Sequence, residues 1–146
     1  MARRSRIDIL KRLASHTETE NARRLAERLR GLDAEERRLQ QIRGYLAEYG
    51  QESGHGRSMT IGSLKSGRGF LERLRNAVDE QRGAVDVQRR QVEQQTLNWR
   101  AARARTRSLE KLGEREAEGE RERADRREQA RLDEMANGRG GTDRKV

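Results

Sequence analysis

The chain has 146 residues, of which 40% are charged, 31% hydrophobic and 3% aromatic, and its formal net charge is +9. This apolar content is too low for the compact core of an ordinary globular domain of that length. Cysteine is absent, which excludes disulfide bonds and thiolate zinc sites within the chain and is typical of a reducing compartment.

Low hydrophobicity combined with high charge is also typical of disorder. Proline is absent, however, and the strong helix formers Ala, Glu, Arg, Leu and Gln are abundant. A long helix needs only a narrow apolar stripe, so the composition favours an elongated helical protein. No apolar run approaches the roughly 20 residues that span a bilayer, and no signal peptide is visible. We therefore expect an intracellular protein.

The first predicted helix covers residues 1–49. Leucine recurs every seven residues along it, which is the spacing of a coiled-coil seam. The leucines are Leu25, Leu32, Leu39 and Leu46. We expect them to form the seam, with Ala22 and Leu29 at the alternate position and with Ile42 and Tyr49 near the end. A weaker apolar stripe precedes them at Ile7, Leu10, Leu13 and Ala14.

A break in the helical pattern follows at residues 50–69, which include six glycines. Each glycine inside a helix costs on the order of 1 kcal/mol relative to alanine. We therefore predict a glycine-rich loop that reverses the chain.

The second predicted helix, residues 70–136, has the clearest heptad pattern. One seam position is Leu71, Val78, Val85, Val92, Trp99 and Thr106, and the other is Leu74, Gln81, Gln88, Gln95, Ala102 and Leu109. The two patterns predict an all-α fold of two long helices that form an antiparallel coiled-coil hairpin. A reversal centred near residue 60 places Leu46 opposite Leu74, Leu32 opposite Gln88, and Leu25 opposite Gln95.

The second helix is too long for the first to cover, so residues beyond about 119 are expected to extend as a single helix. This extension consists mainly of Glu and Arg, and we expect Glu118 and Glu122 to pair with Arg121, Arg126 and Arg127. Glycines near the end predict a helix stop and a disordered tail at residues 137–146.

No pattern in the chain predicts catalysis, a cofactor or a metal. His16 and His55 have no second ligand at metal spacing, and the glycines around Lys65 lack the spacing of a phosphate-binding loop. A two-helix fold also offers no cavity of catalytic size. The chain is therefore expected not to be an enzyme but to bind other proteins.

Charge and polarity leave some alternatives open. Four arginines at positions 100, 103, 105 and 107 have no acid between them, but 25 acidic residues are interspersed with 34 basic ones. Scattered arginines with few aromatic residues fit an acidic protein surface better than a nucleic acid. The three seam glutamines either fix the register of the hairpin or weaken a seam that must flex or bind partners.

Aromatic residues gather on both sides of the predicted loop, as Tyr45, Tyr49 and Phe70. Tyr49 and Phe70 either cap the end of the coil or belong to a binding surface, whereas Tyr45 falls one position before the seam and is expected to face outward. Exposed aromatic residues beside apolar ones are typical binding anchors.

At these residues the sequence resembles the flagellar export protein FliJ family over nearly its whole length. The matching pieces are the segments 45–49, 70–74, 110–115 and 127–135, with Gln81 one heptad after Leu74 and Trp99 in the middle of the second helix. Two departures from the family are the glycine-richer loop and a C-terminal half in which arginine largely replaces lysine.

The resemblance implies a cytoplasmic component of the flagellar type III export apparatus, peripheral at the inner membrane. It implies a protein similar to the central stalk of rotary ATPases, which sits in the hexameric ring of the export ATPase FliI. It also implies that the chain contacts the cytoplasmic domain of the export gate FlhA and escorts export chaperones. It further implies roles in flagellum biogenesis, motility and chemotaxis.

The resemblance also implies two surfaces. The gate-binding residues would be Tyr45, Tyr49, Phe70, Leu74, Ala77 and Gln81, and the ring-binding residues would be Arg3, Arg4, Arg6, Arg126 and Arg127, within the paired ends of the chain. Two alternatives are the equivalent stalk of a virulence type III secretion system and a basic nucleic-acid-binding coiled coil.

Overall fold

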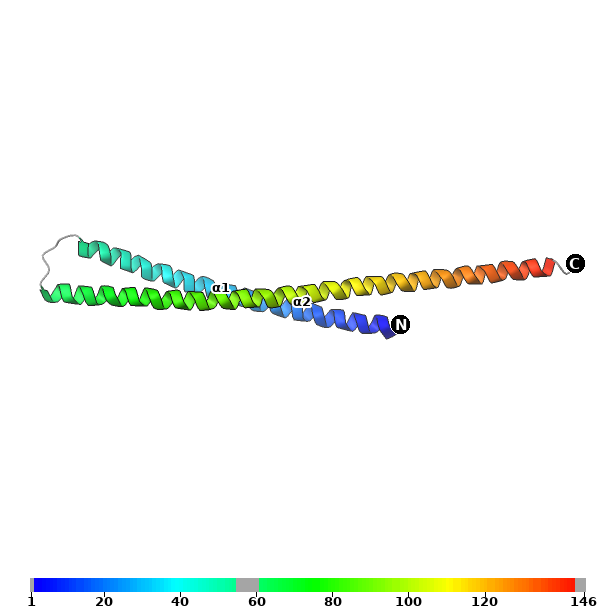
Figure 1. The fold of residues 1–146 in the computed structure, drawn as a ribbon, viewed down its shortest axis with the longest axis horizontal. Coiled ribbons are helices and arrows are strands. Elements are labelled where there is room, and N and C mark those ends of the chain that lie inside the picture. Colours follow the sequence, from blue (N-terminus) through cyan, green and yellow to red (C-terminus); the bar gives the residue numbers. More distant parts are fainter. Residues whose placement is uncertain (1, 55–60, 144–146) are drawn as a thin grey trace. The chain divides into compact units, whose positions relative to one another are not determined.

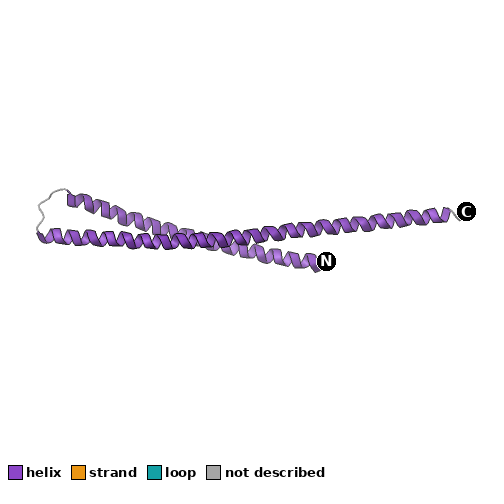
Figure 2. Cartoon of the chain, in the orientation of Figure 1, coloured by secondary structure: helices purple, strands orange, loops and turns teal. Residues whose placement is uncertain are grey.

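The computed structural model describes residues 2–54 and 61–143, and all of them are helical (Figures 1 and 2). Helix α1 is Ala2–Gly54 and helix α2 is Ile61–Asp143. Side chains are described for residues 2–51 and 67–139. None of the described helices is long and apolar enough to cross a membrane.

Both helices extend further than the sequence predicts. Helix α1 ends at Gly54 rather than at residue 49, and α2 begins at Ile61 rather than at residue 70. Helix α2 also continues to Asp143, past the expected stop after residue 136. Glycine lowers helix stability but keeps its backbone N–H, so without proline the helical hydrogen bonds continue through it. Residues 55–60 of the predicted loop and 144–146 of the predicted tail lie outside the described residues.

The chain divides into two compact units, and each contains a part of both helices. Unit 1 is residues 1–18 with residues 102–146, and unit 2 is residues 19–101. In unit 2, Gln95 contacts Asn21 and Gln81 contacts Glu35, so α1 and α2 run antiparallel. The same holds within unit 1, where Arg4 contacts Glu120 and Ile7 lies beside Gly113. The prediction of an all-α fold with two long helices packed as a hairpin is confirmed.

The core of unit 2 lies where the two leucine and valine stripes meet. Leu39, Val78 and Val85 form a buried cluster, and Val85 is the most buried of them at 2% exposed. Leu32, Ile42 and Leu46 pack around this cluster. Every seam position predicted for the second helix from Leu71 to Leu109 is buried or half-buried, so the heptad assignment of α2 is confirmed.

The alternate seam of α1 differs from the prediction. Leu29 is 48% exposed and Ala22 is exposed, so neither lies in the seam. The positions one residue earlier, Asn21 and Arg28, contact α2 instead. They lie at seven-residue intervals from Ile42, which is in the seam, and a regular heptad cannot include both sets. The seam of α1 in unit 2 is therefore more polar than predicted.

The seam of unit 1 is made largely of small side chains. Ile7 and Ala14 of α1 are buried, as are Ala102 and Thr106 of α2. The Thr106 hydroxyl donates a hydrogen bond to the Ala102 carbonyl at 3.1 Å, so its polar atom has a partner. Leu10 and Leu13, which the sequence assigns to the upstream stripe, are 40% and 59% exposed. Counting back in sevens from Leu25 leads to Glu18 and Lys11, which are half-buried, so Leu10 and Leu13 lie beside the seam positions rather than on them.

Beyond Glu120, none of the α2 residues with described side chains is buried. All 19 residues from 121 to 139, here named the terminal extension, are exposed. Ion pairs along this region join Arg123 to Glu116 at 3.4 Å and Arg131 to Glu128 at 3.3 Å. These differ from the partners predicted from i, i+4 spacing, and at such exposure each contributes less than about 1 kcal/mol.

Candidate binding surfaces

The first candidate surface lies in unit 2, where α1 ends and α2 begins. Tyr45, Tyr49 and Phe70, here named the aromatic strip, are 60%, 38% and 39% exposed. The rings of Tyr49 and Phe70 contact each other across the two helices, with centroids 4.5 Å apart and planes inclined by 50°. This tilted contact is a favourable aromatic geometry. The structure therefore brings together one aromatic residue from each helix and leaves large parts of all three exposed.

The other predicted residues of this surface are less accessible. Leu74 and Ala77 are half-buried in α2. Gln81 is only 9% exposed, and its amide nitrogen is hydrogen bonded to Glu35. Leu74 and Gln81 occupy the seam, as their heptad positions require. The aromatic strip with the edges of Leu74 and Ala77 is therefore available to a partner, whereas Gln81 is directed at α1.

The second candidate surface belongs to unit 1 and includes both ends of the chain. Arg3, Arg4 and Arg6 are exposed on the first turns of α1, and Arg126 and Arg127 are exposed on the terminal extension. Arg4 lies 3.4 Å from the carboxylate of Glu120, which joins the start of α1 to α2 just before the extension. The terminal extension presents both signs of charge and two exposed apolar side chains, Leu132 and Met135.

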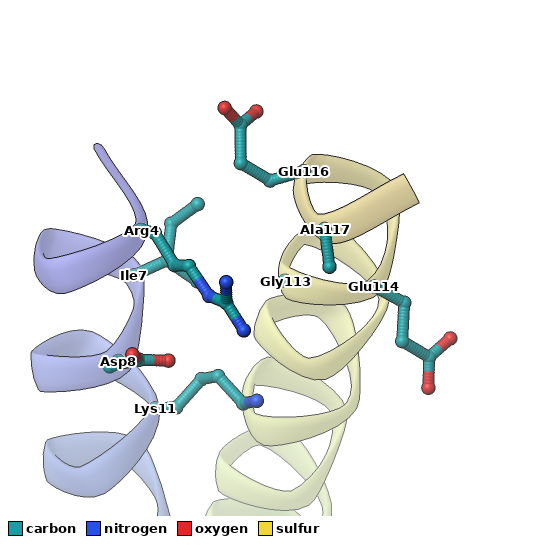
Figure 3. Close-up of a pocket in the computed structure, with 8 residues that line it drawn as sticks. All are labelled: Arg4, Ile7, Asp8, Lys11, Gly113, Glu114, Glu116 and Ala117. Carbon is teal, nitrogen blue, oxygen red and sulfur yellow. The ribbon is translucent and has the colours of Figure 1, made fainter. Parts of the chain in front are cut away.

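A small groove lies beside the first turns of α1 (Figure 3), with a volume of about 200 Å³. Arg4 and Lys11 extend from α1 towards α2, and Glu114 and Glu116 line the groove on the α2 side. Gly113 forms part of the wall, and a Cβ added there would lie 3.5 Å from Ile7 Cγ2 and 3.4 Å from Lys11 Nζ. The missing side chain at Gly113 therefore lets the stems of Ile7 and Lys11 pack directly against α2.

Polar contacts cross the seam of unit 2 at two of the three glutamines. Gln81 Nε2 donates to the backbone oxygen of Glu35 at 3.0 Å and also to its carboxylate. Gln95 Nε2 donates to the backbone oxygen of Asn21 at 3.1 Å and to its side-chain oxygen at 3.0 Å. The sequence places Leu25 opposite Gln95, but the residue that satisfies this amide is Asn21, one turn earlier. We name the levels of Gln81, Gln88 and Gln95 the glutamine layers.

The sequence identifies the glutamines but not their partners. Asn21, Arg28 and Glu35 follow one another at intervals of seven, the same interval as the glutamines. This seven-residue spacing could have identified the three polar residues of α1 as seam positions. The apolar Ala22 and Leu29, each one residue later in the chain, favoured a register shifted by one residue instead. Among the residues with described side chains, no cluster of His, Asp and Glu fits a metal ion, and His16 is exposed. His55 lies outside the described residues.

Comparison with known proteins assigns the chain to a family. The family described as Flagellar FliJ protein matches residues 3–143, which is nearly the whole chain. No curated protein matches the chain. The chain therefore belongs to the flagellar FliJ protein family and is a protein related to flagellar export.

Proposed function

We propose that this protein is the non-enzymatic central stalk of the flagellar export ATPase ring. In this role it couples the ring to the cytoplasmic domain of the export gate and escorts export chaperones. It acts in the cytoplasm, peripherally at the inner membrane through the export apparatus, and is needed for flagellum biogenesis, motility and chemotaxis. Membership in a flagellar family favours this role over the stalk of a virulence secretion system.

The observation that carries the proposal is the terminal extension. An isolated helix in water is marginally stable, because most helical stability in proteins comes from packing of one face. Here 19 consecutive helical residues have no such packing within the protein. Their mixed charges and the exposed Leu132 and Met135 are available to a surrounding partner. A ring that encloses this segment would supply the packing that the protein itself does not.

The basic residues at the paired ends give the proposal its second support. Arg3, Arg4 and Arg6 begin α1, and Arg126 and Arg127 lie just beyond the end of the packed region of α2. Arginine forms bidentate hydrogen bonds with carboxylates, so these side chains are suited to an acidic surface inside the ring. The aromatic strip is the corresponding anchor for the gate, because a few aromatic residues usually dominate an interface.

ATP hydrolysis by the purified export ATPase tests the ring contact. The wild-type chain is expected to stimulate hydrolysis, and Arg126→Glu with Arg127→Glu is expected to reduce this stimulation while the helical circular dichroism stays unchanged. Reversal at Arg3, Arg4 and Arg6 should act in the same way.

A matched control is Arg82→Glu with Arg90→Glu, since both side chains are exposed on α2 in unit 2. This control changes the net charge equally and should retain stimulation. If both double variants stimulated hydrolysis like wild type, the ends of the chain would not be the ring contact. If both lost it equally, only net charge would matter.

A further inference from the structure

The three glutamine layers differ in one respect that the heptad alone does not explain. In the outer layers the residue of α1 at the seam is an acceptor, Glu35 for Gln81 and Asn21 for Gln95. The middle layer has Arg28 at the equivalent position, seven residues from each. Arginine has five donors and no acceptor. The Arg28 side chain cannot accept a hydrogen bond from the amide of Gln88. Among the described residues the Gln88 side chain makes no hydrogen bond, whereas Gln81 and Gln95 also donate to a backbone oxygen of α1.

Arg28 is directed elsewhere. Its Nη1 donates to Gln91 Oε1 at 2.7 Å, on the neighbouring turn of α2. The opposite side of the layer has no side chain at all, because it is occupied by Gly31. A Cβ added to Gly31 would lie only 3.3 Å from Gln88 Oε1. The absence of a side chain at this position therefore lets the amide oxygen of Gln88 lie close to the backbone of α1.

Gly31 and Gln88 line an open groove in unit 2 with a volume of about 580 Å³. We name it the Gly31 groove, and it is lined by Arg24, Glu27, Arg28, Gly31, Gln88 and Gln95. Its positive side chains outnumber its negative ones, since Arg24 and Arg28 face a single acid. That acid, Glu27, already lies 3.8 Å from the guanidinium of Arg23. The groove therefore combines excess positive charge with a solvent-accessible amide nitrogen, that of Gln88, which has no acceptor among the described residues.

We propose that the Gly31 groove binds an acidic side chain of a partner protein, whose carboxylate accepts hydrogen bonds from Gln88 and from Arg24 or Arg28. The carboxylate takes the place that Glu35 and Asn21 fill in the outer layers. Arg24 to Gly31 spans about 10 Å along α1, the length of two helical turns. This length suits one Asp or Glu with its flanking residues on a partner helix. A nucleic acid fits less well, because the groove has no aromatic residue for base stacking.

This surface is separate from the aromatic strip and from the ends of the chain, so it does not depend on the proposed stalk role. It adds a third place on the hairpin at which a protein partner binds. The proposed partner is defined by an exposed carboxylate on a helix.

Nuclear magnetic resonance of the uniformly ¹⁵N-labelled full-length chain tests the proposal. The probe is an alanine-rich helical peptide with one central Glu, and the control is the same peptide with Gln at that position. The side-chain amide of Gln88 should shift with the Glu peptide more than those of Gln81 and Gln95, and it should not shift with the Gln peptide. Inorganic phosphate and an oligothymidine strand are titrated separately. An equal Gln88 shift with phosphate or a larger one with oligothymidine would overturn the assignment to a protein carboxylate.

Arg28→Asn provides a second, independent measurement. It gives the middle layer the same acceptor as the Asn21 layer, so Gln88 gains a partner within the chain. Because the same change removes the hydrogen bond from Arg28 to Gln91, the gain and the loss offset each other. We expect the midpoint of thermal unfolding to change by less than about 3 °C, the effect of one net hydrogen bond, and the Gln88 response to the Glu peptide to be lost.

Arg37→Asn is the control, because Arg37 is exposed on α1 and pairs with Asp33 outside the groove. It should leave the Gln88 response intact. A Glu-peptide response that persisted in Arg28→Asn would show that the middle layer is not missing an acceptor.

Discussion

Replacing the glutamines one at a time with leucine separates the layers that have partners from the layer that does not. Gln81→Leu adds apolar burial beside Val78 and Val85, which stabilises the folded state by about 1.5 kcal/mol. It also removes the hydrogen bond to the Glu35 carboxylate, and bonds to charged groups contribute about 1.5–3 kcal/mol. The net change is therefore expected to lie between zero and about 1.5 kcal/mol of destabilisation.

Gln88→Leu removes no hydrogen bond among the described residues. The half-buried position gains about 1 kcal/mol from apolar burial, so this variant should be more stable than wild type. The two leucine variants should then differ by about 1–2.5 kcal/mol, or roughly 3–8 °C in the midpoint of unfolding. Thermal melts followed by circular dichroism at 222 nm, with urea melts to check the slope, measure this difference.

Gln40→Leu is the matched control for these melts, because Gln40 is exposed on α1 and buries nothing on replacement. It should change the midpoint little, which corrects for the general effect of leucine on helix stability. Equal stabilisation by Gln81→Leu and Gln88→Leu would refute the reasoning, since it would mean that the contact with Glu35 contributes nothing.

Three further outcomes follow from burial. Val85→Ala should destabilise unit 2 by about 2 kcal/mol in urea melts, because Val85 is 2% exposed and removal of its methyl groups leaves a cavity. If the loss of stability were no larger than that of an alanine substitution at an exposed position, the core would lie elsewhere. Tyr45→Ala should lower the affinity for the gate's cytoplasmic domain by about tenfold and leave the melting midpoint unchanged. Tyr49→Ala should also lower the midpoint, because it loses the contact with Phe70. If both variants lowered the midpoint equally, Tyr45 would not be the more exposed of the two tyrosines. Ending the chain after Glu120 should leave the cooperative melt in place and reduce only the helical signal, since the terminal extension is unpacked; loss of the cooperative transition would show that it packs.

The heptads of the second helix could be predicted from sequence because a regular period is a strong constraint. Once Val78, Val85 and Val92 define one seam position, the glutamines can occupy only the other. The structure buries or half-buries the whole set. Two-helix packing then follows, because neither stripe can be buried alone.

The first helix was harder to predict because two registers differ by one residue. Leucine and alanine at 29 and 22 look better suited to a seam than arginine and asparagine at 28 and 21. The register with Asn21 and Arg28 is favoured because the seven-residue period must also include Ile42, and because the glutamines of α2 form hydrogen bonds with polar residues of α1. Hydrophobicity alone does not capture this pairing of polar groups across the seam.

The helix ends and the Gly31 groove were not predictable for different reasons. Glycine marks a weak point in a helix but does not enforce a stop, so α1 reaches Gly54 and α2 reaches Asp143. The groove depends on which side chain of each layer faces which, and this requires the register. Of the residues expected to contact the gate, Gln81 belongs to the seam.

The most direct test of the stalk role is an electron cryomicroscopy structure of the export ATPase hexamer assembled with the full-length chain. We expect two antiparallel helices on the axis of the ring, with residues 121–139 of α2 and the first turns of α1 in contact with its subunits. Binding of the chain to the outer surface of the ring, or a ring whose central channel lacks these helices when the chain is bound, would contradict the proposed function.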